Sequence, residues 1–151
     1  MKVLEYQNPC SEQTLREGMA EYFSTFDEFL STRNSSTTAN EFFRCHDAAH
    51  VVFGCGLSLE HEVVVKVSTV FGSTGGMKIL KGYALPESHE IYEEITILDG
   101  AKVAAKTLII VPKILWRCFR MSRRWPWDEF DAYLDLRLID LREEFGIRVG
   151  H

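Results

Sequence analysis

Cysteine is scarce in this sequence, and the four cysteines present (Cys10, Cys45, Cys55 and Cys118) form no C-x-x-C pair. We therefore read them as reduced thiols. The residues after Met1 begin no signal peptide. Together these two absences predict a cytoplasmic protein.

Long hydrophobic runs are also absent, since no stretch approaches the roughly 18 uninterrupted apolar residues of a membrane span. The longest candidate, residues 107–115, contains Pro112 and Lys113. We expect no transmembrane helix, although the chain can still lie on the face of a membrane. A net charge of -5 argues against a general nucleic-acid binder.

Acidic residues are missing from positions 101–125, which hold seven Lys and Arg residues, whereas residues 1–62 hold ten acidic and four basic ones. Five of the basic residues recur at helical spacing and would share one stripe beside a broad apolar surface. They are Lys106, Lys113, Arg117, Arg120 and Arg124. The stripe predicts an anionic partner such as a peripheral membrane surface; the alternative is a basic face in contact with water.

Several catalytic motifs are missing as well. No G-x-S-x-G elbow surrounds a serine, no H-E-x-x-H motif is present, and residues 72–76 lack the spacing of a phosphate-binding P-loop. Hydrolase chemistry and a phosphate-binding role for residues 72–76 are therefore weakly supported.

The apolar periodicity predicts an all-α fold: a single domain over residues 1–151, with about six helices around a metal site and an apolar groove. The expected helices span about 14–32, 38–53, 58–71, 86–98, 101–124 and 128–145. The third also suits a buried strand, because it is rich in valine. Asp99-Gly100 is expected to form a turn, Pro112 to kink the fifth helix, and Gly146 to end the last one.

One cluster carries recognisable chemistry, the run His46-Asp47-Ala48-Ala49-His50 inside the second predicted helix. His46 and His50 lie one helical turn apart, and Asp47 is close enough for all three side chains to converge. A glycine turn at Gly54 and Gly56 would let the next helix bring Glu62 to the same point, with Glu60 as a fallback. The pattern predicts a metal site spanning residues 46–62.

Two imidazoles and two carboxylates suit zinc, and iron(II) or manganese also accept such a set. A pair of structural core histidines is the plain alternative. It is disfavoured because burying four ionisable groups together without a cation is costly.

The order His-Asp-x-x-His-x11-Glu, here His46, Asp47, His50 and Glu62, resembles the coenzyme Q (ubiquinone) biosynthesis family of the Coq-four type. The stretches 54–66 and 141–147 are also similar to that family. The resemblance implies an all-α fold and metal ligation, usually of zinc, by the four motif residues. It also implies a role in replacing the ring C1 carboxylate of a polyprenylated benzenoid precursor with a hydroxyl.

Two functions stay open at this stage. The first is a metal-containing protein of ubiquinone or related isoprenoid-quinone biosynthesis, acting as a C1 decarboxylase and hydroxylase. The second is a non-catalytic scaffold that binds isoprenoid lipid and uses the metal structurally. The expected partners are a polyprenylated lipid or quinone precursor and an anionic membrane, with a homodimer or a biosynthetic complex as open assemblies.

Overall fold

The computed structural model describes residues 3–30, 37–84 and 97–150, with only the backbone described at 27–30 and 97–106. All regular elements in these residues are helical, so the all-α prediction is confirmed, and the valine-rich third segment is a helix. The α-helices are α1 (Leu15–Leu30), α2 (Thr37–Val52), α3 (Leu59–Gly72), α4 (Leu80–Tyr83), α6 (Ile97–Phe119) and α7 (Leu138–Phe145). Short 3-10 helices are η1 (Glu5–Gln7), η2 (Gly76–Ile79) and η4 (Phe130–Tyr133).

Side chains cap the starts of two helices. Before α1, the backbone N–H of Glu17 donates to the Thr14 hydroxyl, and the Glu17 carboxylate accepts from the Thr14 N–H. Before α3, the Ser58 hydroxyl accepts from the N–H of His61. These side chains satisfy backbone donors that would otherwise lack helical partners.

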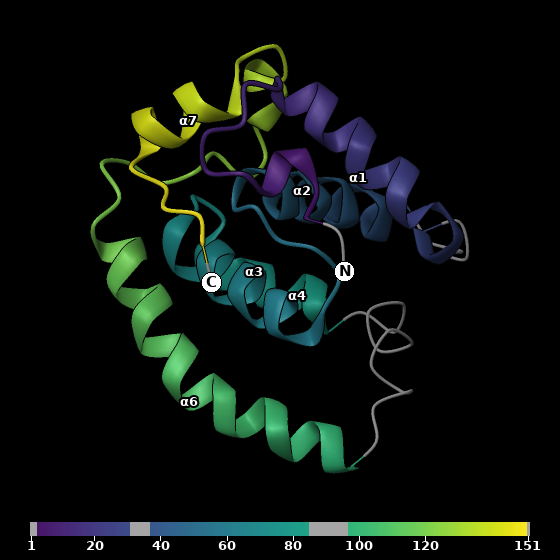
Figure 1. The fold of residues 1–151 in the computed structure, drawn as a ribbon, viewed down its shortest axis with the longest axis vertical. Helices are drawn as coiled ribbons and strands as arrows, with labels where there is room; N and C mark the ends of the chain where they lie inside the picture. Colours follow the sequence, from purple (N-terminus) through teal and green to yellow (C-terminus); the bar gives the residue numbers. More distant parts are fainter. Residues whose placement is uncertain (1–2, 31–36, 85–96, 151) are drawn as a thin grey trace.

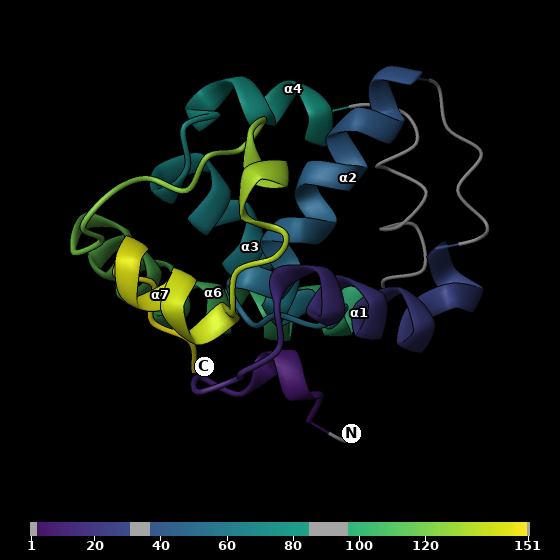
Figure 2. The same cartoon turned by 90° about the horizontal axis from the view of Figure 1, so that it is seen from above.

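The helices are arranged around α2 and α3. The long helix α6 lies along α3 at the edge of the molecule, while α1 packs on α2 and α7 closes the opposite side (Figure 1). Figure 2 shows α2 running from the edge that holds α4 towards the edge that holds α1. The core is shared by side chains from all these helices and from the segment after α6, including Tyr22, Val51, Val65, Trp125 and Leu141.

The side chain of Arg142 is buried, and its hydrogen bonds connect α7 to two other segments of the chain. Its guanidinium donates to the carbonyls of Val51 and Val52 at the end of α2, and to those of Tyr6 and Asn8 near η1. The last carbonyls of a helix have no helical partner, so this side chain completes the end of the helix that carries the histidines.

The prediction of one continuous last helix over about residues 128–145 is wrong, because this stretch is divided into η4 and α7. The segment between them bonds to the start of α1: Leu15 N–H donates to the Leu136 carbonyl and Leu138 N–H to the Gln13 carbonyl. These long-range bonds occupy backbone groups that a continuous helix would need. The end at Gly146 is confirmed, since this residue adopts the left-handed conformation at φ 68°.

The predicted boundaries of the fifth helix are also wrong. Asp99 and Gly100 form no turn but lie inside α6, which ends at Phe119 rather than at Arg124. A glycine inside a helix lowers its stability by about 1 kcal/mol. Favourable packing of the other residues of α6 outweighs this cost. The helix continues through Pro112 and curves along the molecule (Figure 1). The helix predicted at 86–98 falls mostly outside the described residues.

The contact between α3 and α6 is tightly packed. Val64 and Ile114 are buried there, and a pocket between the two helices, with Phe53 and Met121 also in its lining, encloses about 20 Å³. That is room for a single water molecule. This pocket is too small for an isoprenoid tail.

No helix within the described residues combines the length and the apolar character that crossing a membrane requires.

Candidate metal centre

The helical spacing of His46 and His50 brings the two imidazole rings together. Both lie on α2, and their ring centroids are 4.6 Å apart in an edge-to-face arrangement. Both side chains are buried. The sequence prediction that these two residues share one face of a helix is therefore confirmed.

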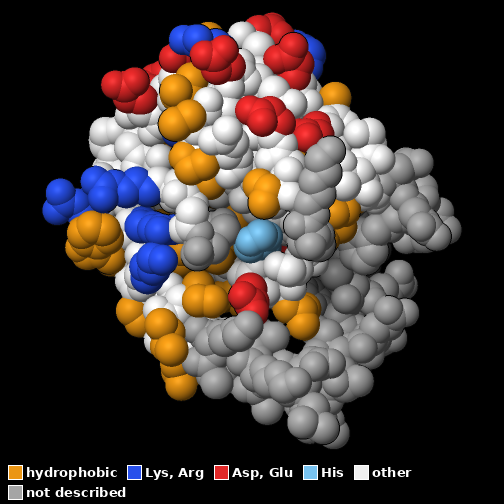
Figure 3. All heavy atoms as spheres, viewed as in Figure 1, with side chains coloured by type: hydrophobic (Ala, Val, Ile, Leu, Met, Phe, Trp, Pro, Cys, Tyr) orange, Lys and Arg blue, Asp and Glu red, His pale blue; other side chains and the backbone are white. Residues whose placement is uncertain are grey.

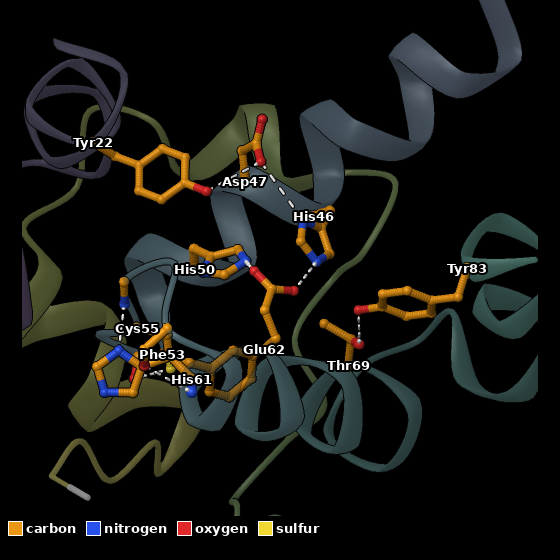
Figure 4. A network of polar contacts seen from close by, with 12 residues as sticks. Tyr22, His46, Asp47, His50, Phe53, Cys55, His61, Glu62, Thr69 and Tyr83 are labelled. Atoms are coloured by element: carbon orange, nitrogen blue, oxygen red, sulfur yellow. Dashed lines mark hydrogen bonds and ion pairs between the residues drawn. The ribbon is translucent and has the colours of Figure 1, made fainter. Parts of the chain in front are cut away.

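The turn after α2 brings a carboxylate to this pair. Gly54 adopts φ 70°, a left-handed conformation that glycine takes without steric cost. The chain then reverses, and α3 presents Glu62 to the histidines (Figure 4). Glu60, the fallback ligand, is not part of this group.

The carboxylate of Glu62 lies between the two imidazoles. Its Oε1 is 3.2 Å from Nε2 of His50, and its Oε2 is 3.7 Å from Nε2 of His46. One ligand atom from each of the three residues falls within 4.8 Å of the others. Three ligand atoms this close could hold one divalent ion between them.

The nitrogen atoms of this cluster lack hydrogen bonds. All four ring nitrogens of His46 and His50 are buried without a hydrogen-bond partner. Burial lowers the pKa of His46 and the adjacent His50 lowers it further, against the opposing effect of the Asp47 and Glu62 carboxylates. Buried imidazole nitrogens without hydrogen bonds are costly, and a metal ion would satisfy one on each ring.

Asp47 occupies a different position from the other three predicted ligands. Its Oδ1 is 3.6 Å from Nδ1 of His46, the ring nitrogen opposite to the one facing Glu62. The same oxygen accepts a hydrogen bond of 3.5 Å from the Tyr22 hydroxyl of α1 (Figure 4). A carboxylate on the far nitrogen of a metal-binding histidine is a common outer partner, which fixes the orientation of the ring.

Aromatic rings surround the cluster. Phe42 stacks on His46 with centroids 5.7 Å apart, Tyr83 contacts the same ring edge-on at 5.5 Å, and Tyr22 lies 5.4 Å from His50. The Lys66 ammonium lies 4.5 Å from the Tyr83 ring centre. Burial lowers the pKa of this lysine, although the nearby Glu62 raises it.

His61 is adjacent to the cluster but faces a different partner. Its Nδ1 accepts a 2.8 Å hydrogen bond from the Gly56 N–H (Figure 4). Burial lowers its pKa, and His50 adds to this effect. This histidine therefore stabilises the turn that brings Glu62 into place.

A wider cleft lies beside the cluster, with a volume of about 340 Å³. Phe42 belongs to its lining and also stacks on His46, so the cleft and the candidate metal centre share this ring. Ile79 and Trp127 add apolar walls, while Lys78 and Lys81 add positive charge and Glu41 and Asp128 negative charge. The volume falls in the range of small-molecule sites.

The predicted site is thus partly reproduced. His46, His50 and Glu62 come together as a group that could hold a metal ion, and Asp47 lies next to it. The residues fit a divalent ion, since two imidazoles and a carboxylate are ordinary ligands of zinc, iron(II) and manganese. Comparison with known proteins found no matching family model, no similar curated protein and no similar solved structure.

Sequence reasoning missed the aromatic residues around the candidate metal ligands. The contact of Phe42 with His46 could have been predicted from the sequence, because Phe42 precedes His46 by four positions on the same helix. Tyr22 and Tyr83 lie on other helices, and no local pattern connects them to the motif.

Proposed function

We propose that this chain is a metal-binding protein of isoprenoid-quinone biosynthesis that binds a polyprenylated benzenoid precursor beside the metal. The observation that carries the proposal is the buried group of His46, His50 and Glu62, with four imidazole nitrogens that lack hydrogen bonds. The sequence motif supplies the quinone assignment. Zinc is the proposed ion, with iron(II) and manganese as alternatives.

The proposed ligands are Nε2 of His46, Nε2 of His50 and a Glu62 oxygen. Asp47 would hold the His46 ring in position and, in turn, be held by Tyr22. When bound, the ion would supply positive charge that polarises a substrate carboxylate. Zinc accepts no electrons, so an oxidative decarboxylation would also require dioxygen with a redox-active metal or another oxidant.

The proposed place for the benzenoid ring is the cleft beside Phe42. Phe42 and Trp127 offer aromatic surfaces for a planar ring, and their centroids lie 5.9 Å apart. Lys78 and Lys81 offer charge for a ring carboxylate.

A structural role of the metal is the second candidate. All three grouped ligands are buried and join only α2 to α3, as expected of an ion that fastens two helices. This alternative is the non-catalytic scaffold that binds isoprenoid lipid.

Elemental analysis of the full chain, purified after metal-replete expression, tests the metal. We expect about one ion per chain; less than about 0.2 equivalents, with no uptake of zinc, iron(II) or manganese, would exclude the site. Solvent extraction and mass spectrometry of the same sample test the precursor. Retained polyprenyl benzenoids support the quinone assignment, and metal without any such compound would remove it.

The cleft is tested with the double variant Lys78→Glu, Lys81→Glu. Binding of a benzenoid carboxylate should weaken by about tenfold or more, because two favourable charges become repulsive. The control is Arg16→Glu, an exposed charge reversal that lines no part of the cleft. Equal affinities in the two proteins would place the carboxylate elsewhere.

A further inference from the structure

The outer face of α6 carries an apolar surface that no other described segment covers. Leu108 is 79% exposed, Ile109 77%, Trp116 52% and Phe119 77%. The helix is oriented by its opposite side, where Ile114 and Cys118 are buried against α3. Isolated apolar residues are normal on surfaces, whereas several along one helix face mark an interaction site.

Positive charge surrounds this apolar surface. Lys113 is exposed on α6, Arg120 and Arg124 are exposed in the segment after it, and Arg148 is exposed after α7. Figure 3 shows Lys and Arg side chains beside hydrophobic ones over the region that α6 occupies in Figure 1, whereas acidic side chains gather at the top. The surface therefore combines apolar contact with local positive charge in a chain whose net charge is -5.

Trp116 links the two kinds of side chain. The guanidinium carbon of Arg120 lies 5.2 Å from a Trp116 ring centre, and that of Arg148 lies 5.8 Å away. Within the described residues, no carboxylate forms an ion pair with either arginine. Arg123 differs, because Glu144 pairs with it at 2.6 Å.

The predicted stripe of five basic residues on one helix is only partly correct. Arg120 and Arg124 are not on α6 but in the segment after it, where Arg124 donates to the Ser73 carbonyl. Arg117 is only partly exposed. The side chain of Lys106 lies outside the described residues. The exposed charges that accompany the apolar surface are Lys113, Arg120 and Arg148.

We infer that this face of α6 docks on an anionic lipid bilayer, with Leu108, Ile109, Trp116 and Phe119 entering the interface and the basic side chains contacting the headgroups. A helix with apolar residues and Lys or Arg beside them is typical of such binding. Tryptophan favours the membrane interface because its ring is apolar and its N–H is polar.

Two other occupants fit less well. A symmetric contact with a second copy would bring Lys113, Arg120 and Arg148 of the two chains together and oppose like charges. A nucleic acid would match the charge but leave the aliphatic side chains of Leu108 and Ile109 without apolar contacts. An anionic bilayer satisfies both components.

The test is sedimentation of the full chain with vesicles of phosphatidylcholine and phosphatidylglycerol at low salt. We expect binding that falls with added salt and is weaker on pure phosphatidylcholine. Lys113→Glu with Arg120→Glu should lower the partition coefficient by roughly 100-fold or more. Leu108→Ser with Ile109→Ser should lower it by roughly tenfold or more, because two exposed apolar side chains are lost.

The matched controls change the same chemistry elsewhere. Met77→Ser with Val3→Ser removes exposed apolar side chains, and Arg16→Glu with Arg137→Glu reverses exposed charges. Both controls should bind as the unchanged chain does. Brominated lipid should quench tryptophan fluorescence, and Trp116→Phe should remove most of that quenching, since Trp125 and Trp127 are buried.

Three results would overturn the inference. The first is no binding to anionic vesicles at low salt, and the second is equal binding by test and control variants. The third is a concentration-dependent dimer that the Leu108 and Ile109 substitutions dissociate, which would make this face a self-association surface. The inference stands apart from the proposed function, because vesicle binding should not change when zinc is added.

Discussion

Oε1 of Glu62 on α3 lies 3.2 Å from Nε2 of His50 on α2, and both side chains are buried. This contact connects the two helices at the point where His46 also converges. The polar atoms of the candidate metal centre come from separate parts of the sequence motif. The centre therefore assembles only when the turn between α2 and α3 is formed.

We expect substitution of Glu62 and substitution of Asp47 to affect metal binding differently. Glu62→Gln should remove most metal binding, because an amide is a weaker ligand than a carboxylate. Asp47→Asn should keep about one ion per chain but weaken its affinity roughly 10- to 100-fold, as expected of a group that acts through His46. Isothermal titration with zinc would measure both. Loss of stoichiometric binding in Asp47→Asn would identify Asp47 as a direct ligand.

Metal binding should also stabilise the fold. Zinc at about 100 times its dissociation constant should raise the free energy of unfolding by about 2.7 kcal/mol, because the ion binds the folded chain. Thermal unfolding with zinc and with a chelator would measure the change. His50→Ala should show no such shift; an equal shift would place the ion elsewhere.

Gly54 should be essential for the turn that brings Glu62 into place. Gly54→Ala should lower the free energy of unfolding by about 2 kcal/mol or more, because alanine disfavours φ 70° and its Cβ would meet the Val149 side chain. Zinc affinity should fall as well. Denaturant unfolding and zinc titration are the measurements.

Gly76 provides the matched control for that substitution. It has φ 55°, yet a Cβ there would find its nearest neighbour, the Val70 carbonyl oxygen, only at 4.0 Å. Gly76→Ala should therefore show the backbone strain alone, about 1 kcal/mol, with zinc affinity unchanged. An equal loss of affinity in both variants would contradict the role assigned to Gly54.

Arg142 should be hard to replace even by lysine. Arg142→Lys should lower the free energy of unfolding by about 3 kcal/mol, because one ammonium cannot reach four carbonyls and leaves some of them unpaired. Arg137→Lys, which changes an exposed arginine, should stay within about 0.5 kcal/mol. Chemical denaturation of the two variants would show whether they differ.

The cysteines should react in an order set by exposure and pKa. Burial raises the pKa of Cys45 to about 11 and also raises those of Cys55 and Cys118. Thiolate is the reactive form, so iodoacetamide at neutral pH should label the exposed Cys10 first, with Cys45 following as the pH rises. Peptide mass spectrometry would report each site. Fast labelling of Cys55 in the folded chain would be inconsistent with its burial.

The raised pKa values of the buried thiols predict that the fold becomes less stable at alkaline pH. The unfolded chain loses its thiol protons near pH 9, the ordinary value, whereas the folded chain retains them to higher pH. The free energy of unfolding is therefore expected to decline as the pH rises above about 9, because the folded state binds more protons there. Denaturant titrations at a series of pH values would measure this. Changing Cys55 to alanine should reduce the slope.

Local patterns in the sequence determined much of this protein. Periodic apolar residues predicted the all-α fold, and the four-residue spacing of His46 and His50 placed both rings on one face. These features depend on residues close in sequence, where backbone geometry alone fixes the distance between side chains. The resemblance to the coenzyme Q family remains a prediction.

Only the tertiary structure decided the rest. The break between η4 and α7 depends on bonds from residues 13–15 to residues 136–138, and the position of Asp47 depends on Tyr22 of another helix. Which face of α6 meets α3 determines that Leu108 and Phe119 are exposed while Ile114 is buried. Such contacts join segments far apart in sequence, so they follow from how the helices pack and not from the pattern of any one helix.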